Sequence, residues 1–125
     1  MATTLEVKET NWDLFCKRFE EAHRGTLVSM EVIYHDGTTE SVAKDLPLRE
    51  FKFAKTEACN DLIRITLGET PHGVIQHQVI EPIHVRLREG NGARKTLQID
   101  AEAGSVELKF SSGRLSALAQ EFELQ

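Results

Sequence analysis

The chain has 125 residues, the usual length of one domain, and we expect residues 1–125 to fold as a single unit. Hydrophobic residues make up 40 % of the chain, which excludes the class of intrinsically disordered proteins. The formal net charge is −5. This disfavours nucleic acid and anionic membrane surfaces as partners, because both require Lys and Arg to neutralise phosphates.

The cysteine content and the N-terminus predict a cytoplasmic protein. Two cysteines, Cys16 and Cys59, are too few for a disulfide framework, so we expect both thiols to be free. The first four residues have neither the basic start nor the apolar run of a signal peptide. No stretch approaches the roughly 18 apolar residues that a membrane span requires.

A helix is predicted from residue 12 to residue 24. Thr10 or Asn11 can cap its first turn, where Asp13 also favours the positive end of the helix dipole. Gly25 suits the left-handed conformation that commonly ends a helix. The apolar side chains form one stripe at helical spacing: Trp12, Phe15, Cys16, Phe19 and Ala22. We expect its aromatic residues, Trp12, Phe15 and Phe19, to be buried on a sheet.

After the helix, apolar and polar residues alternate in short segments separated by turns. Residues 26–34 form a predicted strand, Asp36-Gly37 a hairpin turn, and residues 39–43 a polar edge strand. An extended connection follows, because the residue before Pro47 avoids helical angles. Further strands are predicted around 51–53, 62–67, 97–99 and 106–110, with turns at 58–61, 89–92 and 103–105. Residues 115–122 carry the pattern of a short helix.

In residues 74–88 one set of alternate positions stays mainly apolar on both sides of Glu81-Pro82. This set runs from Ile75 to Leu87 and includes Ile83. A tight hairpin there would put Pro82 at a poor turn position. The pattern therefore predicts one long strand bent near Pro82, or two strands joined at a corner. Taken together, these elements predict an α+β fold, mainly antiparallel β. The N-terminal helix packs on a twisted sheet, a sandwich or a partly closed barrel of about 6–8 strands.

A series of motifs runs along nearly the whole chain. It is a Trp and two Phe on the opening helix, then Leu46-Pro47-Leu48, Ile65-x-Leu67-Gly68, His77-x-Val79-x-x-Pro82, Leu97-x-Ile99 and Leu108-x-Phe110. In this series the chain resembles a family of short uncharacterised bacterial domains of unknown function. Since that family has no established activity, the resemblance implies a bacterial, cytoplasmic origin and assigns no site residue.

His77 is the first candidate site residue, because it shares its parity with apolar neighbours. It is either a general base or ligand in a low-dielectric site, coupled to Glu81, or a core histidine satisfied by a backbone carbonyl. The spacing of His72, His77 and His84 fits no compact zinc pattern, so no metal site is predicted.

A basic stripe is the second candidate. His84, Arg86 and Arg88 share the polar face of one strand, where they could hold a phosphate or carboxylate. The other interpretation is a solvated face paired with acidic neighbours. No aromatic residues alternate with these cations, so single-stranded nucleic acid would find nothing to stack on.

No catalytic nucleophile is predicted, since no serine has a Gly-x-Ser-x-Gly context. No cofactor is predicted either, since the sequence carries no metal-binding box and no phosphate loop. The sequence predicts a non-enzymatic binding or interaction module. The alternative is a small-ligand-binding protein or enzyme with a pocket near His77 and Glu81, with an arginine of the basic stripe at its rim. A homodimer is also predicted, through the weakly charged edge Thr38 to Ala43 or through an uncovered sheet face.

Overall fold

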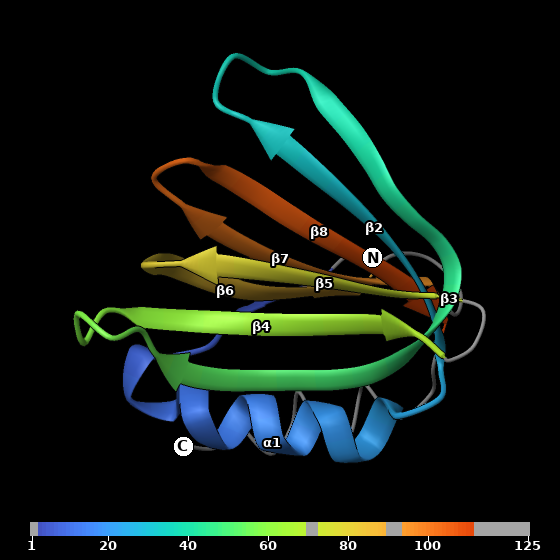
Figure 1. Cartoon of the computed structure of the whole chain (residues 1–125), viewed down its shortest axis with the longest axis horizontal. Helices are drawn as coiled ribbons and strands as arrows, with labels where there is room; N and C mark the ends of the chain where they lie inside the picture. Colours follow the sequence, from blue (N-terminus) through green and yellow to red (C-terminus); the bar gives the residue numbers. More distant parts are fainter. Residues whose placement is uncertain (1–2, 70–72, 90–93, 112–125) are drawn as a thin grey trace.

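The computed structural model describes residues 3–69, 73–89 and 94–111 (Figure 1). The turn predicted at 89–92 lies largely outside these ranges, and the helix predicted at 115–122 lies wholly outside them. The structure confirms the α+β class, and β1 is a strand that the sequence did not predict. The elements are β1 (Thr3–Glu6), η1 (Glu9–Asn11), α1 (Trp12–His23), β2 (Leu27–Tyr34), β3 (Thr39–Lys55), β4 (Asp61–Gly68), β5 (Val74–Ile80), β6 (Pro82–Glu89), β7 (Arg94–Ala101) and β8 (Gly104–Ser111).

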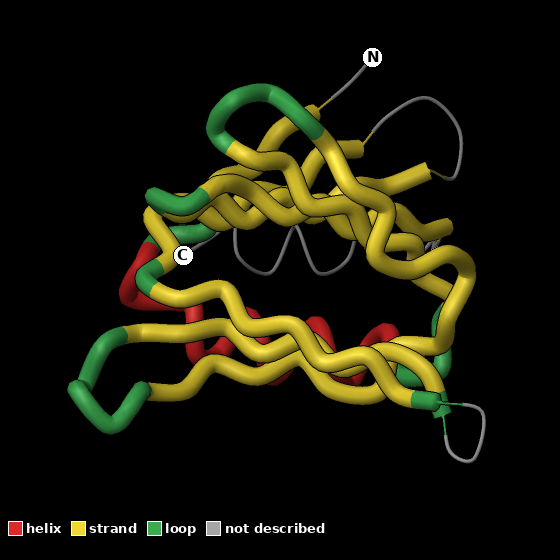
Figure 2. Tube along the Cα trace, turned by 45° about the horizontal axis from the view of Figure 1, so that its top comes forward, coloured by secondary structure: helices red, strands yellow, loops and turns green. Residues whose placement is uncertain are grey.

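The eight described strands form one antiparallel sheet in the order β1-β6-β7-β8-β2-β3-β4-β5. Strand β3 has 17 residues and belongs to both halves of this sheet. Its first half pairs with β2 and its second half with β4. The sheet therefore folds over on itself into two layers, as Figure 2 shows, and it does not close because β1 and β5 remain at its ends.

Three aromatic residues of the apolar stripe of α1 are buried, as predicted, whereas Ala22 is partly exposed. Phe15 and Phe19 are fully buried, and Trp12 is 2 % exposed. The ring of Phe19 lies 4.8 Å from that of Phe51 on β3 and 5.4 Å from that of Phe110 on β8. The helix therefore joins the two layers at one side of the sandwich.

Both ends of α1 lie within one residue of their predicted positions. Asn11 is the N-cap residue, but its side chain makes no capping hydrogen bond, and the turn η1 leads into the helix instead. The indole Nε1 of Trp12 donates to the Val7 carbonyl at 3.0 Å and fixes the first turn. The helix ends at His23, and Gly25 adopts a φ of 86°, the left-handed conformation that glycine allows.

Helix α1 and the residues after it cover the open edge of the second half of β3. The Phe51 N–H donates to Glu20 Oε1 at 3.0 Å. One turn beyond the helix, the Gly25 N–H donates to the Leu48 carbonyl, and the Leu48 N–H donates to the Thr26 carbonyl. These bonds satisfy backbone groups that have no strand beside them.

The carboxylate of Glu20 is the charged group at this covered edge. Burial raises its pKa, but the Phe51 N–H, the Arg24 guanidinium at 2.5 Å and the Lys52 ammonium at 3.7 Å outweigh burial. The pKa of Glu20 therefore lies below its usual value. Glu20 enters the fold as an ionised acceptor for the β3 backbone.

Strands β5 and β6 are joined at a corner, which confirms one of the two predicted arrangements. Glu81 stands between them with a φ of 54°, a conformation uncommon for a residue other than glycine. The pairing of β6 with β7 shifts between Pro82 and His84. Pro82 is buried, whereas Ile83 is 54 % exposed, so the prediction that Ile83 shares the inner face was wrong.

Candidate functional site

His77 lies in the middle of β5, opposite Ile65 of β4. It is half-buried between Ile75 and Val79, the two other residues of β5 that turn toward the core. Burial lowers the pKa of its imidazole, so the ring is neutral near pH 7.

Glu81 lies at the corner after β5, four residues from His77. Its side chain is exposed, and its backbone N–H donates to the Asp61 carbonyl at 2.7 Å. A separation of four residues along a strand is about 13 Å. Among the described residues no hydrogen bond or ion pair joins the two side chains, so the structure does not assemble them into one site.

The basic stripe occupies the outer face of the larger layer, where acidic side chains pair with it. His84 Nδ1 and Arg86 Nε lie 2.9 and 3.2 Å from the Glu6 carboxylate on β1. Arg86 also donates to Asp100 on β7 at 3.0 Å, and Arg88 donates to Glu107 on β8 at 2.9 Å. An incoming anion would have to displace these carboxylates.

The electrostatics of this face agree with internal pairing. Hydrogen bonds from His84 and Arg86 hold the pKa of Glu6 below its usual value. Burial raises the pKa of Asp100, but hydrogen bonds from Ser105 and Gln98 and the nearby Arg86 bring it below its usual value. The geometry matches the second interpretation of the stripe, a solvated strand face with acidic partners.

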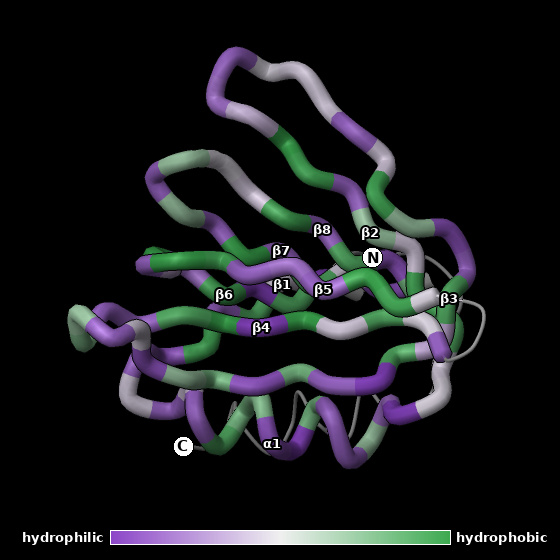
Figure 3. The backbone as a smooth tube through the Cα atoms, viewed as in Figure 1, coloured by the Kyte–Doolittle hydropathy of each residue, from purple (hydrophilic) through white to green (hydrophobic). Residues whose placement is uncertain are grey.

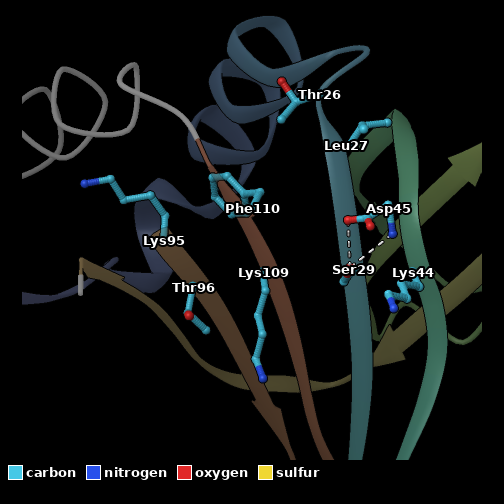
Figure 4. Close-up of a pocket in the computed structure, with 9 residues that line it drawn as sticks. All are labelled: Thr26, Leu27, Ser29, Lys44, Asp45, Lys95, Thr96, Lys109 and Phe110. Atoms are coloured by element: carbon cyan, nitrogen blue, oxygen red, sulfur yellow. Dashed lines mark hydrogen bonds between the residues drawn. The ribbon is translucent and has the colours of Figure 1, made fainter. Parts of the chain in front are cut away.

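A groove of about 810 Å³ runs across the neighbouring strands β7, β8, β2 and β3 (Figure 4). Lys44 and Lys109 stand on either side of Ser29, whereas Lys95 points away at the far end. Ser29 Oγ accepts a hydrogen bond from the Asp45 N–H at 3.1 Å. Sequence reasoning missed this groove, because its lysines come from three strands and only the folded sheet brings them to one surface.

Strand β5 is an open edge of the sheet, since it pairs only with β4 within the described residues. The bond from the Glu81 N–H to Asp61 fixes the alternation of its backbone groups. Residues 75, 77 and 79 direct their N–H and C=O groups toward β4, and residues 74, 76, 78 and 80 direct theirs away from it. The side chains of the second set are all exposed.

The β5 edge carries none of the features that usually prevent strands from pairing across an edge. It has no charged residue and no proline, and its pairing with β4 runs without a bulge. Val74 and Ile80 are 41 % and 52 % exposed. In Figure 3 the two ends of β5 are hydrophobic and its centre is hydrophilic.

The other open edges described in the structure are protected. Strand β1 is only four residues long and ends at the ion-paired Glu6. The first half of β3 pairs only with β2, which confirms the predicted edge position of residues 39–43, but two register shifts opposite Met30 bend it. The second half of β3 is covered by α1.

No three His, Cys, Asp or Glu side chains gather closely enough to hold a metal ion in the described part of the chain. No helix there is long and apolar enough to cross a membrane.

Cys16 is buried, Cys59 is exposed, and both thiols are free, as predicted.

Comparison with known proteins gives one family. A model of DUF5335, described as a family of unknown function, matches residues 3–116. No curated protein and no solved structure matches the chain.

Proposed function

Because the chain belongs to DUF5335, a family of unknown function, we propose its function from its geometry: it is a non-enzymatic interaction module, and its partner is a second copy of the same chain. The open edge of β5 is the observation that carries this proposal. A regular, uncharged edge strand offers unpaired N–H and C=O groups to any extended chain that can lie beside it.

The sequence suggested the edge from Thr38 to Ala43 for the same role. That segment does lie at an edge, but its bulges interrupt the regular spacing of backbone groups that strand pairing needs. Glu40 and Lys44 add charge along it. We therefore place the interface at β5.

We further propose that the protein works in the bacterial cytoplasm. The resemblance to short bacterial domains supports the origin. The exposed free thiol of Cys59 supports a reducing compartment, since an exposed thiol in an oxidising compartment is prone to form disulfides.

Sedimentation velocity at micromolar concentrations tests the proposed function. The wild-type chain is expected to sediment as a dimer. The double variant Gln76→Lys/Gln78→Lys, which puts two charges on the exposed side of β5, is expected to sediment as a monomer with an unchanged circular dichroism spectrum. A wild-type chain that remains monomeric throughout would contradict the proposal.

Small-ligand binding is the second candidate function, and the groove of Figure 4 favours it more than His77 and Glu81 do. The groove of Figure 4 and two smaller grooves along the described residues are lined by other side chains than these two. Lys44 and Lys109 suit an anionic ligand beside Ser29. A rise in melting temperature with inorganic phosphate that Lys44→Ala abolishes would support this function, and the absence of any rise would contradict it.

A further inference from the structure

The sequence of β5 reads nearly the same in both directions. From residue 74 to residue 80 it is Val-Ile-Gln-His-Gln-Val-Ile, with His77 at the centre. Gln76 and Gln78 flank the centre, and aliphatic residues occupy both ends. An antiparallel strand with this symmetry can pair with its own copy so that like side chains meet along its whole length.

We propose that two copies of the chain pair edge to edge through β5, antiparallel, with His77 on the two-fold axis. This inference rests on the proposed function and specifies its interface. In this register His77 faces His77 of the partner subunit, Gln76 faces the partner's Gln78, and Val74 faces the partner's Ile80. In each copy the second half of β3, β4 and β5 form a layer of three strands, and the two layers become one continuous sheet of six strands.

The backbone independently requires the two-fold axis to pass through a residue, as it does in this register, and not between two residues. Residues 74, 76, 78 and 80 direct their N–H and C=O groups away from β4, as the Glu81 bond to Asp61 establishes. A two-fold axis at His77 pairs even-numbered residues only with even-numbered residues. Every outward backbone group of β5 therefore meets an outward group of the partner. An axis placed one residue away, at Gln76 or Gln78, would again pair even with even, but it would bring the imidazole opposite an aliphatic residue.

The side chains agree with the same arrangement. Val74 and Ile80 are among the large apolar side chains that the described chain leaves exposed, and the pairing covers each with the other. On the inner face, Ile75 faces the partner's Val79 on both sides of the histidine pair. Burial holds the pKa of His77 below its usual value, so the two imidazoles meet uncharged at neutral pH.

Disulfide trapping tests the position of the axis. Directly opposite residues that do not exchange hydrogen bonds have Cα atoms about 4.5 Å apart, within the range that a disulfide spans. In a Cys59→Ser background, His77→Cys is expected to form a covalent dimer under mild oxidation. Val74→Cys is the matched control on the same strand, because two such residues would lie about 20 Å apart.

If His77→Cys disturbs folding, substitutions that change the charge of β5 test the register instead. Gln76→Lys/Gln78→Lys places lysines opposite lysines and is expected to weaken the dimer by roughly tenfold or more. Gln76→Glu/Gln78→Lys places each new acid opposite a new base of the partner, and it is expected to keep the dimer. The two variants alter the same two positions of β5, and in this register they differ in whether like or opposite charges face each other across the axis.

The outcomes separate this inference from the proposed function. A covalent dimer with His77→Cys but not with Val74→Cys supports the register. If the wild-type chain is a dimer but Val74→Cys forms the cross-link, the proposed β5 register is wrong. The same holds if the two charge variants dimerise equally well. In both cases the proposal of a homodimer remains. A wild-type monomer overturns both proposals.

Discussion

The contact between Glu20 and the backbone of β3 allows the effect of one substitution on folding to be worked out. Replacing Glu20 with Ala leaves the Phe51 N–H without its acceptor, and a hydrogen bond to a charged group contributes about 1.5–3 kcal/mol. Arg24 and Lys52 have side chains 64 % and 51 % exposed, so their ion pairs add at most about 1 kcal/mol. We expect Glu20→Ala to lower the free energy of unfolding by about 2–4 kcal/mol.

Glu20→Gln is the matched control, because the amide oxygen can still accept the Phe51 hydrogen bond. We expect it to cost about 1 kcal/mol in urea denaturation at pH 7. The folded-state pKa of Glu20 is lowered, so its contribution is complete above the unfolded value of about 4.3 and is lost as the pH falls through the folded value. The difference between wild type and Glu20→Gln should therefore shrink below roughly pH 4. Equal midpoints for wild type and Glu20→Ala at pH 7 would refute the reasoning.

Three further predictions concern the core, the corner and the thiols. Phe19→Ala should lower the free energy of unfolding by about 3–5 kcal/mol in the same assay, since Phe19 is fully buried, and an unchanged midpoint would contradict its place in the core. Glu81→Gly should raise the stability by up to about 1 kcal/mol by relieving a left-handed φ, and a loss would show that the side chain matters at the corner. Thiol titration of the denatured, unreduced protein should find two free groups, Cys16 and Cys59, and finding none would mean that they are bonded.

The elements of this fold that depend on local signals could be predicted from the sequence. The stripe of Trp12, Phe15 and Phe19 indicated the helix, and Asp36-Gly37 indicated the hairpin. The unbroken parity across Pro82 indicated either one long bent strand or two strands joined at a corner, and the structure has the corner. Strand β1 could not be predicted, because its four residues form a strand only by pairing with β6, far away in the chain. The exposure of Ile83 depends on a register shift that no local pattern records.

The candidate site was harder to predict, because a residue type does not reveal its partners. Arg86 and Arg88 were correctly assigned to one polar face, but their acidic partners come from three other strands. The seven residues of β5 showed an alternating pattern, yet only the order of strands in the sheet makes that segment an edge.

The pairing of β1 with β6 has a consequence for the order in which the chain can assemble. Glu6 contacts Arg86, which lies 80 residues further along the chain. During synthesis β1 is made before the other described strands, and β6, on which it docks, emerges only after β2 to β5. Closing so long a loop costs roughly 4 kcal/mol in chain entropy, so this strand is expected to join last in folding and to open first in the native state. Its amide hydrogens should accordingly exchange with solvent faster than those of β7 and β8.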